Sequence, residues 1–276
     1  LATITGVNYV NADCVDNGKK GAFFILARGK EADIIHAVFE GSEGKWETQL
    51  FELDVDGFNR ADFTYLNSGS YIFGGYNNKY ANEIVMRSIE LKAGGAGKLG
   101  APFTKNFNSR IADFDVVTAA DSDLIVVVGE EFKSQASFLW LKVDVADLSI
   151  GAMKIQEIGL VPNEKETHED IVFKCANNAG AKSFECVNSG KNMFSYHVAY
   201  AYNLNEEGDD FITASQVKAK LRNIVNLTPI KIDFKITNNT SFVSFMVRNE
   251  NIKSTKPELG QKPEPAVPAL FEDAYL

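Results

Sequence analysis

The sequence is poor in cysteine, histidine and tryptophan. Its 276 residues include three Cys, three His and two Trp. The histidines lack the spacing of metal ligands, so we expect no zinc site. Neither a G-x-S-x-G sequence nor a phosphate-binding loop occurs, and these mark many hydrolases and nucleotide-binding proteins. The sequence therefore contains no familiar catalytic motif.

The sequence also lacks an excess of positive charge and any long apolar run. Lys and Arg together number 28 against 37 Asp and Glu, which gives a net charge of −9 and a pI near 5.0. A nucleic-acid-binding protein needs a basic face, and an anionic membrane surface attracts basic segments. No apolar run approaches the about 20 residues that span a bilayer. We therefore expect no nucleic-acid partner and no membrane insertion in this segment.

The composition is that of a globular protein, with 45% hydrophobic and 24% charged residues and 20 phenylalanines. A chain of this length forms two domains or one large all-β domain. It begins at Leu1 without an initiator methionine or a signal-peptide pattern. We therefore expect either a processed chain or a segment of a longer one.

Runs of β-branched and aromatic residues alternate with Gly, Asn and Asp turns along the chain, which predicts strands and few helices. One group of four consecutive strands is expected at 113–118, 124–132, 137–145 and 152–160. Similar groups precede and follow it, and their first strands start near Asn8, Asp62, Asp113, Asp170 and Asp233. Four strands in each interval of about 50 residues are typical of a β-propeller.

The chain resembles β-propellers in architecture over residues 1 to about 250, and no particular family is identified. Four blades are expected to be complete, whereas the fifth has two clear strands. A pair of β-sandwiches is the alternative fold. We place the propeller-like domain at 1–252 and an extended tail at 253–276, because the tail holds four of the seven prolines and proline cannot donate to a sheet ladder.

The cysteines and the glycosylation sequons favour a secreted or cell-surface protein. Cys175 and Cys186 flank a turn and are expected to form a disulfide, which leaves Cys14 free or paired with another chain. Sequons begin at Asn226, Asn238 and Asn239, the last two where a hairpin turn is expected. The alternative is an intracellular protein with three reduced thiols.

Acidic residues open the inner strands, and this arrangement resembles five-bladed propeller glycosidases. In that family, carboxylates on the inner strands of successive blades act as base or nucleophile, stabiliser and general acid. The resemblance implies Asp62, Asp113 and Asp170 as catalytic candidates. An Asp before a strand is also a common turn former, because its side chain bonds the local backbone. We therefore predict no catalytic residues and keep the glycosidase as the alternative.

The segment 52–62, ELDVDGFNRAD, resembles the calcium loops of integrin-type propellers. The candidate ligands are Asp54, Asp56, Asn59 and Asp62. Glu52 and Arg60 depart from the pattern of that family at its two ends. We interpret the segment as a solvated turn, with calcium as the alternative, and expect no other cofactor.

Together these observations predict a secreted or cell-surface glycoprotein with a structural or binding role. Self-assembly into a filament or matrix is one form of that role, with the C-terminal tail packing on a neighbour. We expect protein partners or self-association, with carbohydrate as a further candidate. The alternatives are the glycoside hydrolase and an intracellular interaction scaffold.

Overall fold

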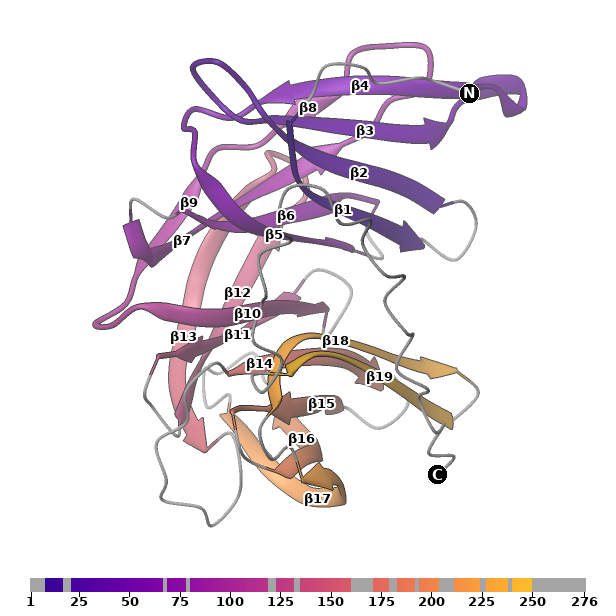
Figure 1. Ribbon diagram of the computed structural model, residues 1–276. Coiled ribbons are helices and arrows are strands. Elements are labelled where there is room, and N and C mark those ends of the chain that lie inside the picture. The colour runs from indigo at the N-terminus through magenta and orange to yellow at the C-terminus, as the bar shows by residue number, and fades with distance from the viewer. Residues whose placement is uncertain are drawn as a thin grey trace, which may run out of the picture.

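The computed structural model describes residues 8–16, 21–66, 69–77, 80–118, 123–131, 135–159, 171–178, 183–191, 194–203, 211–223, 227–237 and 240–249. These residues form five antiparallel sheets, each made from consecutive strands of the chain (Figure 1). A single turn of 3-10 helix, η1 (Ser42–Gly44), joins two of the strands. Among the described residues there is no helix of the length and apolarity that a membrane crossing requires.

The first two sheets contain the N-terminal half of the strands. Blade 1 consists of β1 (Asn8–Asp16), β2 (Gly21–Arg28), β3 (Ile34–Glu40) and β4 (Trp46–Glu52), paired in that order. Blade 2 consists of β5 (Phe58–Tyr65), β6 (Tyr71–Asn77), β7 (Tyr80–Glu90), β8 (Lys98–Leu99) and β9 (Phe103–Asn106).

The outer position of blade 2 departs from the expected single strand. Both β8 and β9 pair with β7, at different places along it. Pro102 lies between them and cannot donate to the ladder. Gly100 instead donates its backbone N–H to the carbonyl of Ser88 and accepts a hydrogen bond from Nε of Arg87, both at 2.8 Å.

The remaining three sheets continue the same order. Blade 3 consists of β10 (Ile111–Thr118), β11 (Asp123–Glu130), β12 (Gln135–Asp144) and β13 (Ser149–Gly159). Blade 4 consists of β14 (Val172–Asn178), β15 (Ser183–Ser189), β16 (Phe194–Asn203) and β17 (Phe211–Asn223). Blade 5 consists of β18 (Leu227–Thr237) and β19 (Thr240–Asn249).

The sheets are arranged as the blades of a propeller. The first strand of each sheet contacts the first strand of the next, in the order β1, β5, β10, β14 and β18. These five strands are the inner strands, and the later strands of each blade lie progressively farther out (Figure 1). The predicted all-β propeller with four complete blades and a two-stranded fifth is therefore confirmed.

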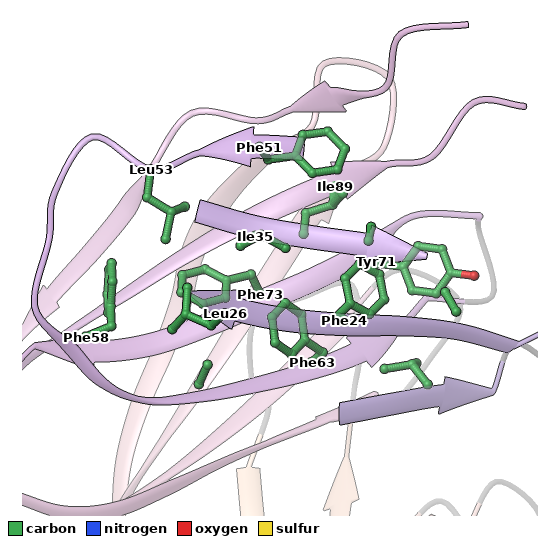
Figure 2. Packing of buried hydrophobic residues seen from close by; sticks show 14 of the residues in the cluster. Phe24, Leu26, Ile35, Phe51, Leu53, Phe58, Phe63, Tyr71, Phe73 and Ile89 are labelled. Carbon is green, nitrogen blue, oxygen red and sulfur yellow. The ribbon is translucent and has the colours of Figure 1, made fainter. Parts of the chain in front are cut away.

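The hydrophobic core is divided into layers between successive blades. Blades 1 and 2 enclose an aromatic layer in which Phe24 stacks on Phe63 at 4.7 Å between ring centroids (Figure 2). In the same layer Phe58 meets Phe73 edge-on at 5.3 Å. Three further layers lie between blades 2 and 3, blades 3 and 4, and blades 4 and 5. The many phenylalanines of the sequence thus serve to fill the space between sheets.

Strand β11 shows why a continuous apolar run forms a central strand here. Leu124, Val126 and Val128 point into the layer shared with blade 2. Ile125 and Val127, on the opposite face, point into the layer shared with blade 4. All five are buried, so the strand needs apolar residues at every position.

Candidate functional site

A cluster of charged side chains lies where the inner strands of blades 2, 3 and 4 approach one another. Nζ of Lys174, on β14, is 3.1 Å from Oδ1 of Asp62 on β5 and 2.6 Å from Oδ1 of Asp115 on β10. A guanidinium nitrogen of Arg60, on β5, is 2.6 Å from Oδ1 of Asp113 on β10. We call these five residues the central charge cluster.

The carboxylates of the cluster also bond the backbone of the following blade. Oδ2 of Asp62 accepts the N–H of Val116 at 3.2 Å. Oδ2 of Asp113 accepts the N–H of Phe173 at 3.0 Å. Oδ2 of Asp115 accepts the N–H of Cys175 at 2.5 Å. Each of these bonds joins two inner strands, so the carboxylates hold neighbouring blades in register.

Asp62 and Asp115 share the ammonium group of Lys174, and their pKa values move apart. Burial would raise the pKa of Asp62, but the ammonium and the hydrogen bonds around it lower that pKa to about 2. Burial and the negative charge of Asp62 raise the pKa of Asp115 well above its usual range, against the opposing effect of Lys174. Burial opposes the charge on Lys174, yet the two carboxylates raise its pKa. Asp62 therefore carries the charge, and Asp115 is the group that takes a proton first.

Asp113 is completely buried and has no exposed oxygen for a substrate to contact. Burial raises its pKa to about 6, although Arg60 and two backbone N–H groups act in the opposite direction. One of those N–H groups belongs to Phe114, the next residue, at 2.7 Å. Asp113 is the third residue of β10 and not its first, but this local bond is of the kind that structural aspartates make to their own backbone. The geometry favours blade alignment as the role of Asp113.

The other acids of the repeat have different positions. Asp170, the third carboxylate implied by the glycosidase resemblance, lies outside the described residues. Asp233 is exposed on β18, opposite Ser244 of β19. The structure thus brings Asp62 and Asp113 into one cluster and places Asp233 on a solvent-facing surface.

Sequence reasoning missed Arg60, Asp115 and Lys174, which belong to the cluster, and Asp13 of β1, whose charge acts on Lys174. A signal was present, because Arg60 alternates with Asp62 and Asp113 alternates with Asp115. Alternate residues of a strand point to the same face, so the two members of each pair are expected to lie on one face of their strand. Lys174 gave no comparable signal, since it is the only charged residue in its strand.

The candidate calcium ligands are divided between a turn and a strand. The carboxylate of Asp54 lies 2.7 Å from Arg87, and the carbonyl of Asp56 accepts a hydrogen bond from the side chain of Asn77. Asn59 and Asp62 lie on β5, where Asp62 binds Lys174. In the described ranges, no group of three or more His, Cys, Asp or Glu side chains is placed to hold a metal ion.

The predicted disulfide is present between Cys175 and Cys186. The two residues lie directly opposite each other on β14 and β15, and both are buried in the layer between blades 3 and 4. Cys14 is exposed on β1 and is not disulfide-bonded. The sequon residues Asn226, Asn238 and Asn239 lie outside the described residues. By position, the last two fall between Thr237 and Thr240, which pair across the β18–β19 hairpin.

Blade 1 has an apolar face that is not covered by blade 2. Cross-strand pairing places Ile25, His36 and Leu50 in one row on this face, with Leu50 62% exposed. Phe23 and Trp46, at 40% and 66% exposure, lie on the same face. Blades 2, 3 and 4 each lie between two core layers, so this exposure is special to a terminal blade.

Blade 5 has a corresponding exposed face. Phe242 and Met246 of β19 are 53% and 57% exposed, while Val243 and Phe245 between them pack toward blade 4. We call Phe23, Trp46 and Leu50 of blade 1, together with Phe242 and Met246 of blade 5, the terminal apolar faces. In a propeller these faces lie on either side of the junction between the last and first blades. Exposed apolar patches of this kind mark interaction surfaces.

The sequence matches no protein-family model and no curated protein. Among solved structures, the β-propeller domain of Nup133 from Vanderwaltozyma polyspora is similar, with 8% identity and a TM-score of 0.45 over 87% of this chain and 69% of that chain. Prolyl oligopeptidase B from Galerina marginata, bound to a 35mer substrate, shows 14% identity and a TM-score of 0.34. The alignment covers 88% of this chain but 31% of the enzyme chain. These similarities concern architecture at very low identity, and they assign no function to this chain.

Proposed function

We propose that this protein is a structural, protein-binding β-propeller of the cell exterior that self-associates through its terminal apolar faces. The observation that carries the proposal is the exposure of Phe242, Met246, Trp46 and Leu50 on the two terminal blades. Burying such side chains against a partner stabilises a complex by about 25 cal/mol for each Å² of apolar surface removed from water. The buried, ion-paired carboxylates of the central charge cluster favour a structural role for that cluster.

The disulfide and the sequons support the proposed compartment. Disulfides form and persist in oxidising environments and are rare in the cytosol. The Cys175–Cys186 bond is buried in a core layer, so it is a structural element of blade 4. Three sequons in the fifth unit offer sites for glycans.

Sedimentation velocity over a range of protein concentrations tests the self-association. The double variant Phe242→Glu/Met246→Glu is expected to weaken association by about tenfold or more, because it charges two interface positions. Ile155→Glu is the matched control, since Ile155 is 43% exposed on β13, away from the terminal blades. A wild-type chain that stays monomeric at every concentration contradicts the proposal.

The intact mass of native protein, before and after glycan removal and reduction, tests the compartment. We expect added glycan mass at one or more of Asn226, Asn238 and Asn239. We also expect two of the three cysteines to react with an alkylating agent only after reduction. An unmodified mass with three free thiols would place the protein in the cytosol and favour the intracellular scaffold.

A further inference from the structure

We propose that the free edge of β19 binds residues 269–276 of a second copy of this chain, which pair there as an added strand. The inference rests on the proposed function, because it names the element through which self-association occurs. The resulting contact is head-to-tail, because each copy contributes the edge of β19 to one neighbour and residues 269–276 to another.

In the described part of the chain, blade 5 ends at its second strand, β19, so the outer edge of β19 is open to pairing. In the described part of the chain its sheet has two strands, whereas each other sheet has at least four. On those residues β19 pairs with β18 alone, so its outer side presents backbone N–H and C=O groups to an incoming strand. A two-stranded ribbon is marginally stable by itself, and a third strand extends its ladder. Addition of an extended segment to a sheet edge is an established way for proteins to bind peptides.

The exposed face of blade 5 suits a segment that is both apolar and acidic. Lys235 lies opposite Phe242, and Lys231 lies opposite Met246. Asp233 lies between the two lysines on this face, which leaves one positive charge from the three side chains, although the whole chain has a net charge of −9. The face therefore combines apolar contacts with positive charge.

Residues 269–276, ALFEDAYL, have this composition and contain no proline. In a strand, alternate residues share a face, so Phe271, Asp273 and Tyr275 would point the same way. Paired with β19, that face would set two aromatic rings and a carboxylate beside Phe242 and Met246, with the two lysines of β18 one strand farther away.

The sequence before this segment favours a second copy over the segment's own β19. Residues 250–268 contain all four prolines of the tail. Proline-rich segments act as semi-rigid spacers that extend about 3.1 Å for each residue. We therefore assign the segment to a second copy and not to the β19 of its own chain. A head-to-tail contact of this kind continues from copy to copy unless a ring closes.

Two double variants of the full chain test the proposal by complementation. The edge variant is Phe242→Glu/Met246→Glu, which keeps the segment. The segment variant is Phe271→Glu/Tyr275→Glu, which keeps the edge. Each alone is expected to associate at least about tenfold more weakly than wild type. Their mixture is expected to form 1:1 complexes and nothing larger, because one intact edge and one intact segment remain. Sedimentation velocity and native mass spectrometry measure both results.

The outcomes separate the two proposals. If the edge variant loses association and the segment variant behaves as wild type, residues 269–276 do not bind the edge. That result overturns this inference and leaves the proposed function standing. A wild-type chain that is always monomeric overturns both. If the wild type is monomeric and the segment variant is less stable than the wild type, the segment binds β19 of its own chain. That result also overturns binding to a second copy. Circular dichroism and the Ile155→Glu control exclude misfolding as the cause of any loss.

Discussion

At the scale of single residues, Lys174 is the side chain that pairs with two carboxylates of the central charge cluster. It is the cation that reaches both Asp62 and Asp115, which belong to two different blades. Its side chain is 28% exposed, whereas that of Asp115 is 1% exposed. A carboxylate that is held away from water needs a cation or a proton, and Lys174 supplies the cation.

Lys174→Met is expected to lower the free energy of unfolding by about 3 kcal/mol, because it leaves two buried carboxyl groups without their cation. Denaturant unfolding at neutral pH measures the change. Adding Asp62→Asn to this variant is expected to recover a large part of the loss, since it removes the unpaired charge. Lys142→Met, at an exposed position of β12, is the control and is expected to change stability by about 0.5 kcal/mol or less. An equal loss in both lysine variants would show that charge pairing is not the cause.

At the scale of elements, the strands could be predicted because their signal is local. β-branched and aromatic runs between turn residues located the four-stranded groups, including the run that forms β11. Boundaries were harder where a breaker lies inside a strand. β18 begins at Leu227 and continues through Pro229, where its register with β19 shifts. Proline is tolerated at such irregularities, so it does not mark the strand end.

The charge pairing could not be predicted because its partners are distant in sequence. Lys174 and Asp62 are 112 residues apart, and nothing near either residue specifies the other. The exposed faces of blades 1 and 5 likewise depend on which sheets become neighbours. Period-two patterns identify a buried face, but they do not tell which sheet buries it.

Gly75 of β6 allows a close approach between a strand and two aromatic rings. A Cβ there would lie 2.8 Å from ring atoms of both Phe58 and Phe73. Gly75→Ala is therefore expected to destabilise the protein by about 1 to 3 kcal/mol through overpacking. Gly151→Ala is the matched control, because a Cβ at Gly151 meets nothing within 4 Å. Thermal or denaturant unfolding of the two variants checks the difference, and equal stabilities would contradict it.

At the scale of the whole molecule, the central charge cluster and the core layers join the blades in different ways. Each core layer joins two neighbouring blades, for example Phe24 of blade 1 with Phe63 of blade 2. Lys174 also joins blade 4 to blade 2, across the intervening blade. Changes in pH alter this second kind of contact and leave the apolar layers intact.

The contribution of Asp62 to stability is expected to be lost in acid, whereas the raised pKa values of Asp113 and Asp115 act in the opposite direction. Asp62 has a folded-state pKa of about 2, below its usual value of 3.8, so it stabilises the fold above about pH 4. This contribution is lost as the pH falls from about 4 to about 2, and it amounts to roughly 2 kcal/mol. Carbon-13 NMR of the carboxyl groups, with the signal assigned by its absence in Asp62→Asn, measures the pKa. Titration of Asp62 at its usual value would contradict the expected acid sensitivity.

The long separation between Asp62 and Lys174 has a consequence for synthesis on the ribosome. Chains fold from the N-terminus as they emerge, at about 5 to 20 residues each second. Blades 1 and 2 leave the exit tunnel well before Lys174 is made, so Asp62 emerges without its cation. Until blade 4 arrives, the nascent propeller therefore holds Asp62 and Asp115 without the ammonium group of Lys174, and Arg60 of blade 2 is the cation of the cluster already made. Folding of blade 4 supplies the ammonium group. It also supplies the backbone N–H groups that donate hydrogen bonds to the carboxylates of blade 3.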